Sequence, residues 1–212
     1  MATRDDVGAP GGEEKWTPSK AFRTPSYWLL LSAFFLSSMV VAGVLQNEVN
    51  FLTVMGIPMA TATFALGFTG GMGGLGKLAF GFLADRLNPR HAAIVCFAMQ
   101  LVGVVVLIMT HSPAMMCFFV FVYGFSMGGN VAVQPLVTGQ LFGIASFGVI
   151  FGWVSLAGAV GSSVGPVLGG VICDISGSYA TAFIVFLVVY ALATVAIFLA
   201  RSPRMKKAAQ SE

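Results

Sequence analysis

Six long apolar stretches constrain the fold of this 212-residue chain more than any other feature of its sequence. They cover residues 26–46, 58–83, 91–110, 114–137, 146–172 and 179–200. A helix needs about 20 apolar residues to cross the hydrocarbon core of a bilayer. In lipid only helices and closed barrels satisfy their backbone polar groups, and barrel strands show a shorter, alternating pattern. The sequence therefore predicts an all-α membrane protein with six transmembrane helices within residues 25–200.

The basic residues gather on one side of the predicted membrane. The other side receives only the acids Glu48 and Asp174, which we expect in solvated loops. Short loops rich in Lys and Arg stay in the cytoplasm. We therefore expect a multi-pass protein of the inner (cytoplasmic) membrane with a polar cytoplasmic tail or linker at 1–24 and a basic cytoplasmic tail at 201–212. Ten of the eleven bases support this orientation: Arg4, Lys15, Lys20, Arg23, Arg86, Arg90, Arg201, Arg204, Lys206 and Lys207.

The composition argues against a soluble protein. Hydrophobic residues make up 57% of the chain and charged residues only 9%, whereas a charged share of about 25% is ordinary for soluble domains. The net charge of +3 reflects the basic loops and gives no indication of nucleic-acid binding. Cys96, Cys117 and Cys173 have no metal-ligand spacing, so we predict neither a metal site nor a cofactor.

Two enzyme-like motifs lack the context that their chemistry needs. Gly71, Gly73 and Gly76 match a dinucleotide fingerprint, but no strand precedes them and no acid follows about 20 residues later. The segment 161–165 has the spacing of a nucleophile elbow around Ser163, which requires a strand-to-helix turn, a His and an acid. The two histidines fall near opposite membrane faces. We predict that the chain is not an enzyme; an intramembrane hydrolase that uses Ser163 is the enzymatic alternative.

Lys77 is the one base within a predicted span. An ionisable residue in the membrane is a functional-site hypothesis by default, and the alternative is a side chain that snorkels toward the interface. Ser126, Asn130 and Gln134 recur every four residues and share one helix face. That face either lines a substrate path or forms hydrogen bonds to another helix.

Glycine is abundant within the spans. Gly161, Gly165 and Gly169 repeat every four residues, and Pro166 and Gly170 lie among them. Small residues let membrane helices approach closely, and a proline inside a helix removes one backbone hydrogen bond. The pattern predicts close helix packing, with a kink at Pro166.

The loop at 81–90 resembles the signature loop of the major facilitator superfamily. Gly81, Leu83, Ala84, Asp85, Arg86 and Arg90 match the family's pattern, whereas Asn88 and Pro89 depart from it. The resemblance implies that Asp85, Arg86 and Arg90 form a conformational latch on the cytoplasmic side. The alternative is that these charges only orient the protein.

Three further segments are similar to monocarboxylate porters and oxalate–formate antiporters. They are 22–28, the stretch 76–81 around Lys77, and the start of the last span at Tyr179. The Gly165–Pro166 pair also resembles the family's Gly-Pro motif in the fifth span of a six-helix half. The resemblance implies the carboxy-terminal half of a transporter, built as two inverted three-helix repeats, with Lys77 meeting a substrate carboxylate. Oxalate–formate antiporters carry a second base in the helix that matches 146–172, whereas this segment holds none. The resemblance therefore implies a monocarboxylate rather than a dicarboxylate.

These inferences predict secondary active transport of a small organic anion, by proton symport or anion exchange. Lys77 would bind the anion, aided by Ser126, Asn130 and Gln134. Major-facilitator substrates bind between two halves, so we expect a second six-helix half or a second copy of this chain. A drug or metabolite exporter of the same superfamily and a non-transporting membrane subunit or fragment are the alternatives.

Overall fold

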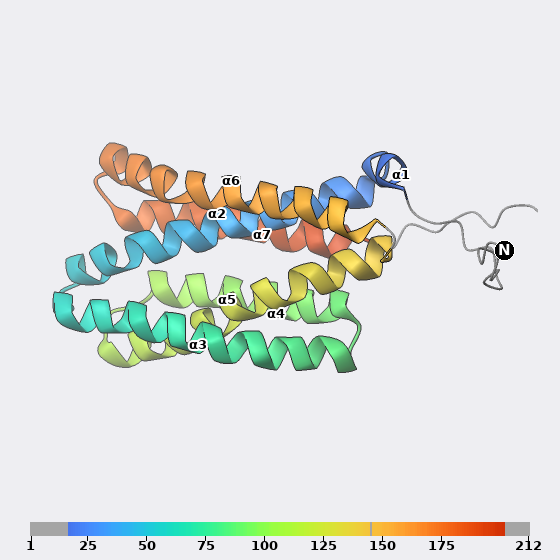
Figure 1. Cartoon of the computed structure of the whole chain (residues 1–212). Coiled ribbons are helices and arrows are strands. Elements are labelled where there is room, and N and C mark those ends of the chain that lie inside the picture. The colour runs from blue at the N-terminus through green and yellow to red at the C-terminus, as the bar shows by residue number, and fades with distance from the viewer. Residues whose placement is uncertain (1–16, 145, 202–212) are drawn as a thin grey trace, which may run out of the picture.

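The computed structural model describes residues 17–144 and 146–201, which form seven α-helices and no strand (Figure 1). The tail residues Arg4, Lys15, Arg204, Lys206 and Lys207 lie outside the described residues. The helices are α1 (Pro18–Phe22), α2 (Pro25–Val54), α3 (Met59–Arg86), α4 (Pro89–Ile108), α5 (Pro113–Phe142), α6 (Phe147–Ser176) and α7 (Tyr179–Leu199).

Local sequence signals set the helix ends. Pro25, Pro89 and Pro113 are the first residues of α2, α4 and α5, where a missing N–H costs nothing. Gly143 and Gly177 follow α5 and α6 with φ angles of 70° and 69°. An L-residue with a side chain rarely adopts such angles, so glycine suits these ends. The connections are short, and successive long helices therefore run antiparallel.

The long helices form one bundle with two distinct ends (Figure 1). At the end that we call the basic end, the Ser26 hydroxyl donates to the Arg201 carbonyl at 2.7 Å, and Arg90 reaches the Phe198 carbonyl. Every described Lys and Arg except Lys77 belongs to this end. At the opposite end, which we call the far end, short turns join α2 to α3, α4 to α5 and α6 to α7.

Five of the described helices are long and apolar enough to cross a membrane: α2, α4, α5, α6 and α7. The all-helical membrane fold is thereby confirmed. The sixth predicted span corresponds to α3, which has 28 residues but is not among these five helices. Its hydropathy is lower because it carries many glycines, several threonines and Lys77. Length alone therefore does not separate α3 from the other five.

One sequence prediction was wrong. The first span was expected to end at residue 46, with Glu48 in a solvated loop, but α2 continues to Val54. Glu48 is 0% exposed, and the next turn buries Phe51 and Leu52 in the core. Burial of these two apolar side chains extends the helix past the polar residues. Asp174 also lies in a helix, the last turn of α6, but it is exposed as expected.

Glycines bring α3 and α5 into backbone contact. A Cβ atom built on Gly128 of α5 would lie 1.7 Å from the Gly73 carbonyl oxygen of α3. A Cβ built on Gly76 would lie 1.8 Å from the Phe125 carbonyl oxygen. No real side chain fits at such distances. Gly73 and Gly76 of the α3 glycine run therefore serve helix contact rather than phosphate binding.

The α2–α6 pair is built in the same way. A Cβ on Gly165 would lie 1.9 Å from the Met39 carbonyl oxygen, and one on Gly161 would lie 2.3 Å from that of Phe35. Gly169 faces the Asn47 side chain, whereas Gly170 has nothing within 4 Å of its Cβ position. Pro166 lies within α6, which continues as one helix on both sides of it. The two closest helix pairs of the bundle thus depend on glycines.

The outer faces of α3 and α6 carry glycines that nothing covers. A Cβ would meet no atom within 4 Å at several positions on each helix. Large apolar side chains next to them are exposed, including Phe68 and Leu78 on α3 and Val160 and Val167 on α6. These open positions are Gly67, Gly70, Gly71, Gly74 and Gly81 on α3, and Gly148, Gly152 and Gly170 on α6.

Alanine substitution distinguishes buried from open glycines. In Gly128→Ala the new methyl group collides with the α3 backbone, and overpacking of this kind costs about 1–3 kcal/mol. We expect a clear drop in the melting temperature of the purified chain in detergent. Gly74→Ala, whose Cβ meets open space, is the matched control and should melt like the parent chain. Equal melting of both variants would contradict the described packing.

Candidate functional site

A concavity of about 260 Å³ with a partly polar lining opens between α2, α5 and α6. Its polar side chains are Ser38 of α2, Asn130 and Gln134 of α5, and Ser162 of α6. Apolar side chains complete the lining: Val41, Ala42, Leu45, Met127 and Val131. Amide and hydroxyl groups in an otherwise apolar wall supply hydrogen bonds to a ligand without adding charge. Such pockets combine apolar walls with a few placed polar groups.

The predicted polar stripe of α5 divides between this concavity and the bundle interior. Asn130 and Gln134 line the concavity together. Ser126 is fully buried instead, and its hydroxyl donates to the Tyr123 carbonyl of its own helix at 3.0 Å. The Ser126 carbonyl accepts from the Cys96 thiol of α4 at 3.0 Å. The helical period of 3.6 residues turns positions four apart gradually away from a common face.

Asn130 connects the concavity to a buried chain of hydrogen bonds. Its amide donates to the Ser37 hydroxyl of α2, which lies 3.2 Å from the Tyr190 hydroxyl of α7. Tyr190 in turn donates to Gln100 of α4 at 2.6 Å. Four helices are joined by this chain, which we call the polar chain. Two of its atoms, Asn130 Oδ1 and Gln100 Nε2, are buried without a protein partner.

Lys77 is exposed on α3 and does not line the concavity. No carboxylate within the described part of the chain pairs with it. Lys77 follows Gly73 by about one helical turn, and Gly73 lies against Met127, which does line the concavity. The backbone of Lys77 therefore lies about one helical turn from Gly73, which packs against a residue of α5 that lines the concavity.

The predicted latch residues lie together at the basic end. Asp85 is exposed and forms no ion pair among the described residues. The Arg86 guanidinium lies 4.5 Å from the centre of the Phe82 ring. Arg90 donates from its side chain to the Phe198 carbonyl and from its backbone N–H to Gln140 Oε1 at 3.1 Å. Arg90 thus joins the start of α4 to the ends of α5 and α7.

The enzyme-like motifs both lie inside helices. The glycines of the dinucleotide pattern belong to α3, and Ser163 donates to the Ala159 carbonyl within α6 at 3.1 Å. His91 lies in the first turn of α4 and His111 at the opposite end of the bundle, beyond α4. Neither a phosphate-binding turn nor a nucleophile elbow is formed at these positions.

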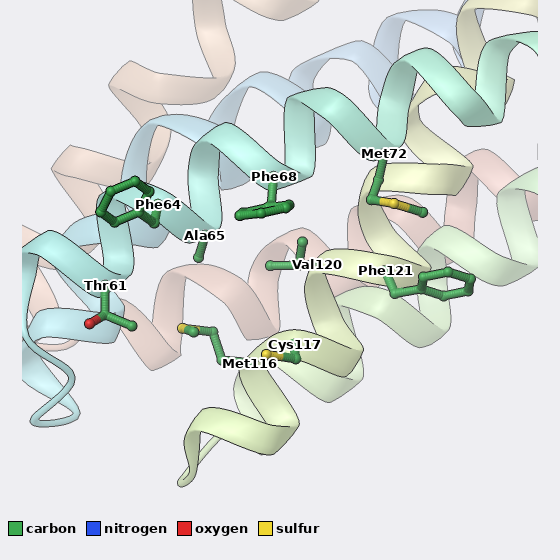
Figure 2. A pocket seen from close by; sticks show the side chains of 9 residues that line it. All are labelled: Thr61, Phe64, Ala65, Phe68, Met72, Met116, Cys117, Val120 and Phe121. Atoms are coloured by element: carbon green, nitrogen blue, oxygen red, sulfur yellow. The ribbon is translucent and has the colours of Figure 1, made fainter.

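A second, apolar groove lies between α3 and α5, as Figure 2 shows. It measures about 350 Å³, and none of the sequence-predicted site residues lines it. Its lining residues are Thr61, Phe64, Ala65, Phe68, Met72, Met116, Cys117, Val120 and Phe121.

Sequence reasoning missed several polar residues of the interior. Ser37, Gln100 and Tyr190 sit within predicted spans, and Glu48 lies just past the predicted end of the first. Polar side chains in a span are costly unless they are paired or functional. That rule would have marked Gln100 and Ser37 as candidates, although it does not reveal that they meet through Tyr190.

Comparison with known proteins identifies the class of this bundle. The sequence model of the Major Facilitator Superfamily matches residues 52–212, which is more than half of the chain. The chain therefore belongs to the major facilitator superfamily. This membership confirms the resemblance seen in the loop at 81–90 and the prediction of a membrane protein of a transport family rather than an enzyme.

The relatives include named transporters. Monocarboxylate transporter 12 of Rattus norvegicus is 30% identical over 140 residues, which are 64% of this chain and 29% of the relative. The oxalate:formate antiporter of Oxalobacter formigenes is 26% identical over 200 residues, which are 91% of this chain and 46% of the relative. The uncharacterized MFS-type transporter YhjX of Escherichia coli (strain K12) is 23% identical over 167 residues, which are 76% of this chain and 41% of the relative. The chain thus spans less than half the length of each of these relatives.

Removal of one hydroxyl tests the polar chain. Tyr190→Phe leaves Gln100 Oε1 and Ser37 without their shared partner, and an unpaired buried polar group costs about 1–3 kcal/mol. We expect a lower melting temperature in detergent. Tyr179→Phe removes a hydroxyl from the half-buried start of α7 and should leave melting unchanged. If Tyr190→Phe melts like the parent, the polar chain does not contribute to stability.

Proposed function

We propose that this chain forms one six-helix half of a secondary transporter that moves a small, monocarboxylate-like organic anion across the cytoplasmic membrane. The observation that carries the proposal is the polar concavity of α2, α5 and α6, where Asn130 and Gln134 lie side by side in the lining. The named relatives, a monocarboxylate transporter and an oxalate:formate antiporter, agree with an anionic substrate.

In this proposal the concavity supplies hydrogen bonds to the anion, and Lys77 supplies a positive charge. The Gln134 amide would donate a hydrogen bond to a carboxylate, and so would the second N–H of the Asn130 amide, whose first N–H is held by Ser37. Lys77 would contribute the positive charge that offsets desolvation of the anion. Ser126 supports this wall from behind, since it is buried in α5. An exposed, unpaired Lys77 on a helix next to the concavity suits a ligand that brings the missing negative charge.

The packing pattern supports two three-helix repeats, α2–α4 and α5–α7. In these repeats α2, α3 and α4 correspond to α5, α6 and α7. The closely packed pair α2 with α6 then corresponds to the other closely packed pair, α5 with α3. The pairs α2 with α7 and α5 with α4 correspond in the same way. Glycines form the backbone contacts in both of the closest pairs, α2 with α6 and α3 with α5. Repeats of this kind are typical of transporters that alternate between two open states.

A second half would cover the open faces of α3 and α6. Both faces present uncovered glycines beside exposed apolar side chains, and small residues favour close helix contact in membranes. A second six-helix half or a second copy of this chain would supply the partner helices. Together the two would enclose the concavity that one half leaves open.

The basic end would face the cytoplasm, with both termini on that side, because Lys and Arg concentrate there. Asp85 and Arg86 are exposed at this end, and Arg90 fastens three helices together. Asp85, Arg86 and Arg90 would then latch the cytoplasmic side against the second half in one conformation. Sliding at the glycine contacts of α6, near Pro166, would accompany release of the latch.

The apolar groove of α3 and α5 favours a second candidate within the same superfamily. A groove lined by Phe64, Phe68 and Met116 suits an apolar drug or metabolite better than an anion. In an exporter of such compounds Lys77 would be incidental, and in a non-transporting subunit neither site would bind a substrate.

Variants of Lys77 separate these candidates. We expect proteoliposomes that contain Lys77→Ala to lose most uptake of radiolabelled lactate, because the positive charge is gone. Lys77→Arg keeps the charge and should retain substantial uptake. Wild-type uptake by the Ala variant would exclude Lys77 from the anion site and favour the exporter.

Reconstitution tests the need for a second half. We expect this chain with a co-expressed six-helix partner to take up radiolabelled lactate, and each half alone to be inactive. Full activity of this chain alone, with a cross-linked dimer on gels, would instead assign the second half to a second copy. Inactivity in every combination and with every anion tested would favour a non-transporting subunit.

A further inference from the structure

Glu48 is a buried acid that the proposed transport site does not use. It lies in α2, two turns before the far end of that helix, and is 0% exposed. Both of its carboxylate oxygens are buried without a hydrogen-bond partner. A buried charge without a partner is strongly unfavourable. The packing described here therefore favours a neutral Glu48 over an ionised one.

No base in the described helices can neutralise Glu48. Tyr123 of α5 lies close enough to interact with it electrostatically, and its hydroxyl bears no charge when protonated. Lys77 is the one described Lys or Arg away from the basic end, and it is exposed on α3. His111 is at the far end, but it is exposed in the turn between α4 and α5 and belongs to no helix. The other titratable groups toward the far end on helices packed against α2 are Cys117 of α5, Cys173 and Asp174 of α6, and Tyr179 of α7, and Tyr190 lies in the middle of α7. All of them are acids or neutral.

The surroundings of Glu48 adjoin the polar chain that starts at the concavity. Tyr123 lies beside the Gln100 side chain, although neither the Tyr123 hydroxyl nor Gln100 Nε2 makes a hydrogen bond of ordinary geometry. Gln100 accepts from Tyr190, and Tyr190 leads through Ser37 to Asn130. Glu48 and Ser37 are both on α2, roughly 16 Å apart along the helix. A change at Glu48 can thus reach the concavity through α2 and through the polar chain.

We propose that Glu48 is the proton-binding site that couples proton movement to anion movement. This inference rests on the proposed transport function and names its coupling ion. When the far end opens to water, the Glu48 carboxylate takes one proton from water and becomes a neutral acid, which fits its buried surroundings in the structure described here. When the acid meets water again in the other conformation, it returns the proton to water. One proton moving with one monocarboxylate transfers no net charge.

The geometry favours a proton over a metal cation. A metal ion such as Zn²⁺ or Ca²⁺ is usually held by several His, Cys, Asp or Glu side chains, and within the described residues no group of three or more of these converges. The one titratable neighbour shown to interact with Glu48 is a tyrosine. A proton needs only the carboxylate itself.

Glu48→Gln mimics the neutral acid permanently and tests the inference in proteoliposomes. The chain is purified together with the proposed second half and reconstituted into proteoliposomes. Radiolabelled lactate is then added outside the vesicles. We expect Glu48→Gln to lose lactate accumulation driven by a proton gradient but to keep lactate exchange at equal pH. Asp174→Asn, which neutralises the exposed acid at the same end, is the matched control and should keep both activities. Gradient-driven accumulation by Glu48→Gln, or accumulation driven by sodium in the parent protein, would overturn the inference.

Infrared spectroscopy gives a readout that needs no substrate. We expect the parent protein to show a carboxylic acid C=O band that titrates with pH and is missing in Glu48→Gln. If Glu48→Gln loses exchange as well, the presence of this band in the parent supports the inference and its absence overturns it. If the parent transports no lactate or other anion, the proposed function fails, while the band still reports whether Glu48 binds a proton.

Discussion

Close contact between helix backbones is the interaction on which this bundle depends. In lipid, burial of apolar surface gives little advantage to helix association, so packing must supply it. Gly73, Gly76 and Gly128 let α3 and α5 touch along their backbones, and Gly161 and Gly165 do the same for α6 and α2. The remaining helices pack around these two pairs. The polar concavity opens between α2, α5 and α6, so the pairs that hold the bundle together also fix the walls of the candidate site.

Polar groups inside such a bundle carry most of the functional information. The polar chain from Asn130 to Gln100 joins four helices, and at its two ends Asn130 Oδ1 and Gln100 Nε2 remain without partners. Unpaired polar groups are expensive in an apolar medium. Their presence is understandable if a substrate, a proton or a change of conformation completes them during transport. Glu48 is a similar case that involves charge, because its buried carboxylate oxygens also have no hydrogen-bond partner.

Much of the fold could be predicted because membrane helices are recognisable from local sequence patterns. The apolar runs, the prolines at helix starts and the glycines at four-residue spacing are visible in sequence, and the loop at 81–90 indicated the superfamily. Glu48 was misplaced because a single acid near the end of an apolar run looks like the start of a loop. Its burial depends on Phe51 and Leu52, which continue the helix into the core. The link from Ser37 to Tyr190 spans 153 residues of sequence, and no local pattern specifies it.

Thiol accessibility at Gln134 tests the central claim, a water-filled anion site between α2, α5 and α6, most directly. In a background without Cys96, Cys117 and Cys173, Gln134→Cys should react with a membrane-impermeant thiol reagent in proteoliposomes. Lactate should slow that reaction by occupying the same space. Val188→Cys, at an exposed apolar position of α7, is the matched control and should react only with a lipid-soluble reagent. If Gln134→Cys also reacts only with the lipid-soluble reagent, and lactate has no effect, the concavity faces acyl chains and the account is contradicted.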